Sequence, residues 1–123
     1  MPKFRVEITG TAQSDIWGIF HYISADNQTA AINLIQEIER QINSLEIFPL
    51  RGPVIPESFE LGVEYRHIIY GHYRTVFKVD HSRVIIMRVI HGARLMNMDI
   101  FEKIPVPNRK ITKENGYEGQ SLR

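Results

Sequence analysis

The chain has no cysteine among its 123 residues, which excludes a disulfide scaffold, a thiolate metal site and a cysteine nucleophile. Long apolar runs are also absent, because the longest covers only residues 84–87, whereas a membrane span needs roughly 18 apolar residues. No glycine-rich phosphate loop, serine elbow or paired-carboxylate motif occurs, so nucleotide, esterase and glycosidase chemistry has no support. We therefore expect no membrane association and a cytoplasmic location.

The residues that are present fit one globular domain. Hydrophobic residues make up 43% of the chain and charged residues 24%, and a chain of this length buries roughly two-thirds of its unfolded surface in a single core. The net charge is only +1, yet Lys and Arg outnumber Asp and Glu by five to two over residues 103–123. This local excess fits an acidic or phosphate-bearing partner, or simply an asymmetric surface.

The first half of the chain predicts a strand and two helices. Apolar and polar residues alternate over residues 3–8, which is typical of a half-buried strand. Thr11 is a candidate cap for a helix that ends near Ser24, and Asp15 lies where a carboxylate complements the helix dipole. A second apolar stripe at helical spacing begins at the break Asp26-Asn27 and continues to about Phe48. The short break predicts an antiparallel helical hairpin.

The second half predicts three antiparallel strands and a tail. Prolines and glycines punctuate residues 49–56, which argues for a loop without regular structure. Three short runs follow at residues 65–69, 73–79 and 84–91, separated by turn-like triplets. The order β-α-α-β-β-β defines an α+β fold in which the hairpin covers one face of a mainly antiparallel sheet and leaves the other face open. We assign residues 1–103 to this domain and residues 104–123 to a polar C-terminal tail.

Arginines are the first candidates for a functional surface. Alternation along the predicted strands puts Arg66, Arg74 and Arg88 at positions that cannot all enter an apolar core unpaired. Arg94 follows the last strand after Gly92. We expect the arginines to share the open face of the sheet as a cationic patch. An equally good interpretation is that they solvate the sheet and pair with Glu57, Glu60, Glu64 or Asp80.

Histidines are the second candidates. Four of the five lie in the middle of the chain, at positions 67, 72, 81 and 91, but none has the spacing of a metal-binding helix and no cysteine is available, so we expect no metal site. His91 stands at the end of the last predicted strand, where it suits either a general acid or base or a hydrogen-bonded structural role.

The order and spacing of these segments resemble the RelE/ParE superfamily of toxins from type II toxin-antitoxin systems, in particular its ParE branch. The resemblance covers about residues 4–101. Its residues are Ala12, Asp15-Ile16, Ile19, Tyr22, Ile23, Ala30-Ala31, Ile38, Leu45, Phe48-Pro49-Leu50-Arg51-Gly52, Tyr65-Arg66, Tyr73-Arg74-Thr75-Val76-Phe77 and Val89-Ile90-His91-Gly92-Ala93-Arg94.

The resemblance implies a toxin without a cofactor that is neutralised in a hetero-oligomer by a cognate, ParD-like antitoxin. ParE-like members inhibit DNA gyrase, whereas RelE-like members cleave mRNA on the ribosome. The ribonuclease alternative would use Arg74, His91 and Arg94, but no tyrosine follows Arg94 where many RelE-like members have one. The ParE interpretation is therefore favoured.

The resemblance also implies an antitoxin- or target-binding surface on this chain. Its candidate residues are Arg66, Arg74, Arg88, Arg94, Met96 and Met98. The two methionines suit an adaptable apolar groove, although filling ordinary core gaps is the favoured interpretation of such residues. A further alternative is an inactive family member that serves only as an antitoxin-binding module.

Overall fold

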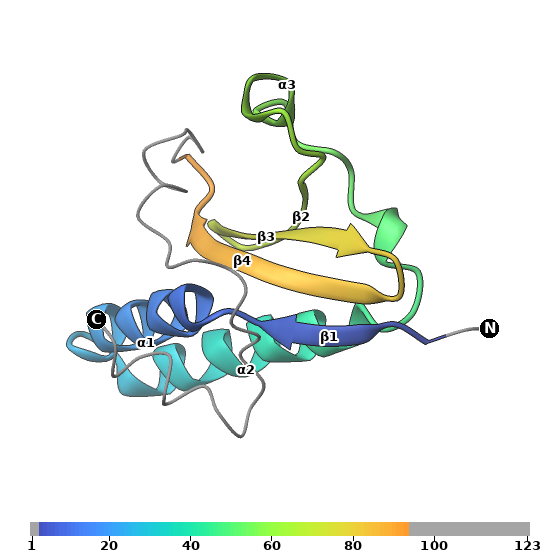
Figure 1. Cartoon of the computed structure of the whole chain (residues 1–123). Coiled ribbons are helices and arrows are strands. Elements are labelled where there is room, and N and C mark those ends of the chain that lie inside the picture. The colour runs from blue at the N-terminus through green and yellow to red at the C-terminus, as the bar shows by residue number, and fades with distance from the viewer. Residues whose placement is uncertain (1–2, 94–123) are drawn as a thin grey trace.

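A computed structural model of the chain describes residues 3–93. It contains two long helices, one short helix and four strands (Figure 1). In chain order these are β1 (Arg5–Ile8), α1 (Gly10–Ser24), α2 (Gln28–Ser44), a 3-10 turn (Pro49–Arg51), α3 (Ser58–Leu61), β2 (Arg66–Tyr70), β3 (Tyr73–Asp80) and β4 (Arg83–His91). The predicted order of elements and the α+β class are confirmed, and the short helix α3 was not predicted.

The passage from β1 to α1 is made by Thr9 rather than by the predicted cap Thr11. The Thr9 side-chain oxygen accepts a hydrogen bond from the Ala12 amide at 3.1 Å, and its hydroxyl donates to the Ile86 carbonyl at 2.9 Å. The cap therefore joins the start of α1 to β4. Thr11 was the wrong choice because the helix begins at Gly10, one residue before it.

The helical hairpin lies along one face of the sheet, as predicted (Figure 1). Its apolar stripe packs on the inward side chains of β3 and β4. Fully buried members of this cluster are Ala12, Ile42, Leu45, Phe77, Val84 and Ile86. The second helix ends at Ser44, four residues before the predicted end, because the chain turns at Leu45.

The sheet has the strand order β1-β4-β3-β2. β1 pairs with β4 in parallel, whereas β2, β3 and β4 form an antiparallel meander. Phe77 pairs with Ile86 and Val76 pairs with Arg88, so Met87 is the extra residue of a β-bulge. β1 ends opposite Ile86, which leaves the second half of β4 at a sheet edge that no strand of the described residues covers.

The face opposite the helices is not open, contrary to prediction. A second apolar cluster lies there, in which Ile55 and Tyr65 pack on Val76, Met87 and Ile90. The Ser58 hydroxyl donates to the Tyr65 carbonyl at 3.0 Å and accepts from the Tyr65 amide at 2.9 Å. The segment between Pro53 and Tyr65 thus folds over the sheet. The prediction failed because the prolines and glycines of this segment indicate a loop without regular structure, and its burial depends on the sheet beneath it.

Within residues 3–93 no helix is both long enough and apolar enough to cross a membrane.

Candidate functional site

Arg88 is bound by Asp15 at the uncovered edge of β4. The Arg88 guanidinium donates from Nε and Nη2 to the two Asp15 carboxylate oxygens, at 2.7 and 2.9 Å. The same carboxylate accepts the Val89 amide at 2.9 Å. Asp15 thus satisfies a β4 backbone donor at the point where β1 has already ended. It does not lie in the first turn of α1 as predicted, because the helix starts earlier.

Arg74 is buried on the opposite face of the sheet, where it is 5% exposed. Its Nη2 donates to Glu57 Oε2 at 2.6 Å, and its Nη1 lies 3.4 Å from His67 Nδ1. Burial, and then the charge of Arg74, lower the pKa of His67, while Glu57 acts in the opposite direction. Glu57, Arg74 and His67 together hold the segment between Pro53 and Tyr65, which we call the covering segment, on β2 and β3. Glu57 belongs to this segment and directly precedes α3.

Arg66 is also held within the molecule. It donates from Nη2 to Glu64 Oε2 at 2.6 Å and from Nη1 to the carbonyls of Gly52 at 2.8 Å and Leu50 at 3.3 Å. In the sheet it pairs with Phe77, whose ring belongs to the helix-side cluster. Arg66 therefore lies on the helix side of the sheet, near its outer edge.

The arginines do not form the expected patch on one open face. Arg66 lies on the helix side, Arg74 lies beneath the covering segment, and Arg88 reaches α1. Each is within hydrogen-bond distance of a carboxylate of its own chain. Buried guanidinium groups need such partners, since desolvation of an unpaired charge is costly. The alternative interpretation of these arginines, pairing with carboxylates, describes their geometry.

His91 lies at the end of β4 beside the β2–β3 turn. Its ring is parallel to that of His72, with the ring centroids 6.0 Å apart, and it meets the Tyr73 ring edge-on at 5.7 Å. The Ala93 amide donates to His91 Nδ1 at 3.2 Å, so in the neutral ring Nε2 carries the proton. Both imidazoles are exposed. Arg94, Met96 and Met98, the remaining predicted site residues, lie outside the described residues.

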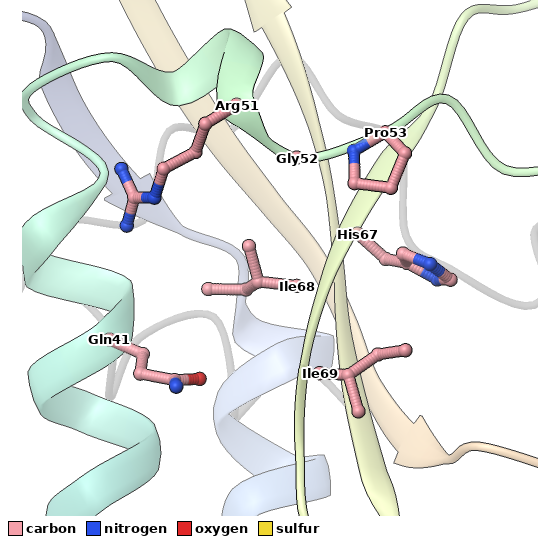
Figure 2. A pocket seen from close by; sticks show the side chains of 7 residues that line it. All are labelled: Gln41, Arg51, Gly52, Pro53, His67, Ile68 and Ile69. Atoms are coloured by element: carbon pink, nitrogen blue, oxygen red, sulfur yellow. The ribbon is translucent and has the colours of Figure 1, made fainter.

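A cleft of about 350 Å³ lies between α2 and β2 (Figure 2). Arg51 stands at one end of it, after the 3-10 turn, and Gln41 on α2 faces Ile68 on β2. Gly52, Pro53, His67 and Ile69 complete the lining. Neither this cleft nor the place of Arg51 in its lining was predicted.

Arg51 differs from every other arginine of residues 3–93, because it has no carboxylate partner. Its Nη1 donates to the Ile47 carbonyl at 2.8 Å and the Phe48 carbonyl at 3.2 Å, and its Nη2 donates to Ser44 Oγ at 2.6 Å. These bonds close the turn after α2 and leave the positive charge without an acidic side chain. The one sequence signal was its place in the run Phe48-Pro49-Leu50-Arg51-Gly52.

Asp15 and His72 were missed as partners of the predicted residues, whereas Glu57 and Glu64 were among the carboxylates named for the arginines and do pair with Arg74 and Arg66. Asp15 was part of the resemblance, but no sequence pattern links it to Arg88, which is 73 positions away. Within the described part of the chain, no three His, Asp or Glu side chains come together in a way that would hold a metal ion.

Two solved structures with a similar fold come from toxin-antitoxin systems. One is described as the chromosomal ParDE system of P. aeruginosa, with 19% identity, a TM-score of 0.56 and coverage of 72% of this chain and 96% of that one. Another is the RelBE2 toxin-antitoxin complex of Mycobacterium tuberculosis, with 21% identity, a TM-score of 0.55 and coverage of 72% and 98%. The chain therefore shares its fold with components of these two toxin-antitoxin systems.

The particular family follows from the sequence. Residues 6–96 match the family described as the ParE toxin of type II toxin-antitoxin systems, parDE. The chain belongs to this family. No curated protein matches it.

Proposed function

We propose that this protein is a ParE-type toxin that inhibits DNA gyrase in the cytoplasm and is neutralised by a cognate, ParD-like antitoxin. The family match supports the toxin class. The fold shared with components of a ParDE system and a RelBE2 complex supports an antitoxin partner. Gyrase as the target is the inference that the ParE resemblance adds.

The observation that carries the choice between gyrase and RNA is the state of Arg74. Cleavage of RNA through its 2′-hydroxyl needs cationic groups that can reach the phosphate. Arg74 is buried and bound to Glu57, so it is held away from an incoming phosphate and its charge is already compensated. A toxin that acts by binding a protein does not need an Arg74 guanidinium that is free of its carboxylate partner.

The direct test is a supercoiling assay with purified gyrase and relaxed plasmid. We expect the protein to block supercoiling and to trap cleaved DNA, and we expect added antitoxin to restore supercoiling. Unchanged supercoiling with the protein in molar excess over gyrase would contradict the proposal.

Arg94 provides a variant for this assay. We propose that it contacts the target or the antitoxin, together with Met96 and Met98. Arg94→Ala should then reduce growth inhibition far more than it lowers the melting temperature, because the substitution removes a contact with the partner rather than a contact within the fold. Equal losses of activity and stability would show that the residue is structural.

One observation favours a ribosome-dependent mRNA ribonuclease as the second candidate. His72 and His91 place two exposed imidazoles side by side at the end of the sheet, where one can act as a base and the other as an acid. Arg94 follows three residues after His91 in the chain. Message cleavage in a translating extract that is lost in His91→Gln, with supercoiling unaffected, would favour this candidate over gyrase inhibition.

An inactive, antitoxin-binding member is distinguished by growth. Cells that express soluble, folded protein without antitoxin and still grow normally would indicate such a module, whereas growth arrest supports a toxin.

A further inference from the structure

The turn that follows α2 presents apolar side chains to solvent. Ile47 is 40% exposed, and Phe48 and Leu50 are each 59% exposed. Pro49, between the last two, is fully buried, so the turn is anchored to the body of the protein at its centre. Apolar and aromatic side chains that gather on a surface in this way are typical of a contact with another protein. We call residues 47–51 the apolar turn.

Phe48 has a backbone conformation that phenylalanine rarely adopts. Its φ is 55° and its ψ is 53°, in the left-handed region that disfavours bulky side chains and tolerates glycine and asparagine. Strained residues of this kind persist where the surrounding structure fixes them, and they concentrate at functional sites. Because glycine or asparagine would make the same turn with less strain, folding does not explain why an exposed phenylalanine stands at this position.

Arg51 fixes the strained conformation. Its Nη1 donates to the carbonyls of Ile47 at 2.8 Å and Phe48 at 3.2 Å, and its Nη2 donates to Ser44 Oγ at 2.6 Å. Figure 2 shows its side chain reaching from the 3-10 turn toward α2. The Arg51 amide also donates to the Phe48 carbonyl at 3.1 Å. The apolar turn is therefore held in one shape before any partner arrives.

Charge indicates what kind of partner fits. Arg51 is exposed and is the one arginine of the described part without a carboxylate partner. The acidic residue closest to it in sequence, Glu46, is bound instead by Lys3 at 3.2 Å. The Arg51 Nε has no hydrogen-bond acceptor among residues 3–93. A carboxylate at the border of an apolar pocket would match this fixed positive charge beside apolar side chains.

The exposed side chains of the apolar turn call for a folded partner. Ile47, Phe48 and Leu50 do not line the cleft between α2 and β2, so they stand outside this recess of their own protein. Such side chains are buried only when a partner offers a concave surface. A pocket for an aromatic ring is built from several packed elements, which one extended or helical segment does not supply by itself.

We propose that the apolar turn docks into a folded partner protein, which receives Phe48 and Leu50 in an apolar pocket and binds Arg51 through a carboxylate at the border of that pocket. Because the turn is fixed before binding, little conformational entropy is lost when the contact forms. In the setting of a toxin the partner is gyrase rather than the antitoxin, and that attribution rests on the proposed function.

The test measures binding of the full chain to purified gyrase and, separately, to the cognate antitoxin. Phe48→Asn removes the ring, and asparagine tolerates the left-handed backbone. We expect this variant to bind gyrase about tenfold more weakly than the parent, and to bind the antitoxin within about threefold of it. Its melting temperature should not fall, because backbone strain is relieved. Unchanged affinity for gyrase would overturn the proposal, and a loss confined to the antitoxin would overturn the choice of partner.

Phe59→Asn is the matched control for Phe48→Asn. Phe59, on α3, is 94% exposed, so the same substitution removes another exposed phenylalanine ring from outside the apolar turn. This control should bind gyrase as the parent does. An equal loss of affinity in both variants would show that surface hydrophobicity in general, and not the apolar turn, supports binding.

Variants of Arg51 separate its charge from its bonds to the turn. Arg51→Gln removes the charge and should weaken gyrase binding about tenfold, whereas Arg51→Lys keeps the charge and should stay within about threefold of the parent. Arg40→Gln, which removes another exposed cation from α2, should have no effect. Because lysine cannot reproduce the bonds that Arg51 makes to the turn, equal losses in the lysine and glutamine variants would contradict recognition of the charge.

Growth assays separate failure of this contact from failure of the proposed function. If the parent arrests growth without binding gyrase, a folded Phe48→Asn variant that binds the antitoxin and permits growth supports the contact and rejects gyrase. If that variant still arrests growth, the contact is rejected. A parent that neither binds gyrase nor arrests growth rejects both. Leu50→Asn, at an exposed position of the same turn, carries the same expectations if Phe48→Asn does not fold.

Discussion

Asp15 and Arg88, 73 positions apart in the chain, form a bidentate ion pair. The Asp15 carboxylate also accepts a hydrogen bond from the Val89 amide. The side chains are only 15% and 11% exposed. Three donors therefore converge on one acidic group at the edge where β1 has ended. This relationship ties the first helix to the last strand directly after the bulge at Met87.

Asp15→Asn should destabilise the fold. The substitution leaves the Arg88 charge largely buried without its counter-charge, so we expect the free energy of unfolding to fall by about 2–4 kcal/mol. Urea denaturation followed by circular dichroism measures this change. Glu37→Gln is the control, because Glu37 pairs with Arg40 on the exposed side of α2 and its loss should have no measurable effect. Equal effects of the two substitutions would contradict the role given to Asp15.

The Glu57–Arg74 pair predicts a compensating double substitution. Glu57→Gln leaves Arg74 buried without its carboxylate, which should cost about 3 kcal/mol. Arg74→Met added to Glu57→Leu should recover most of that loss, because apolar groups of similar volume can replace a buried ion pair. The comparison needs denaturation curves of the two variants and the parent. A double variant as unstable as Glu57→Gln would show that the pair contributes more than mutual neutralisation.

Gly52 and Gly18 allow a controlled test of close packing, because only Gly52 lies against other atoms. A Cβ at Gly52 would lie 2.8 Å from the His67 carbonyl oxygen and 2.9 Å from the Phe77 ring, whereas a Cβ at Gly18 would meet no atom within 4 Å. We expect Gly52→Ala to cost about 1–3 kcal/mol through overpacking. Gly18→Ala, inside α1, should add about 0.5–1 kcal/mol of stability. Thermal melts of both variants test the opposite signs, and a loss of stability in each would refute the packing argument.

The histidine beside Arg74 makes stability depend on pH. Because the pKa of His67 is lowered from its ordinary value of 6.5 in the folded protein, the unfolded chain binds a proton there just below pH 6.5 and the folded chain does not. The free energy of unfolding should therefore fall as the pH drops through this window and level off below the folded pKa. Melting temperatures measured from about pH 7.5 to pH 5 follow this change.

The control for this prediction is another histidine. His67→Gln should flatten the pH dependence, whereas His81→Asn, in an exposed turn whose left-handed backbone asparagine tolerates, should leave it unchanged. A slope that persists in His67→Gln would assign the effect to other groups.

The helices and strands were predictable because their apolar residues repeat at regular spacing. Ile38, Ile42 and Leu45 form one such stripe, and all three are buried. The covering segment was not predictable, because Ile55 and Tyr65 are too far apart to show a period and their burial depends on the sheet beneath them. Helix ends were missed for a similar reason, since Thr9 acts as the cap partly through its bond to Ile86.

The arginines of the candidate site were predicted from the sequence. Their positions relative to one another and to the carboxylates were not predicted. Alternation along a strand gives the face of Arg74, but it cannot show that Glu57 returns to cover that face. It also cannot foresee the bulge at Met87, after which the direction of Arg88 changes. The arginine left without a carboxylate, Arg51, lies in a loop, where no periodic signal exists.

The parallel pairing of β1 with β4 also bears on how the protein comes into being. The pairing partners of β1, from Arg83 to Ile86, belong to β4. This is the last element of the described fold. During synthesis the first strand has no sheet to join until β4 has left the ribosome, although the helical hairpin can form earlier from local contacts. A nascent chain that stops before Arg83 therefore lacks one of the two inner strands of the sheet, and cells should clear such fragments rather than be poisoned by them.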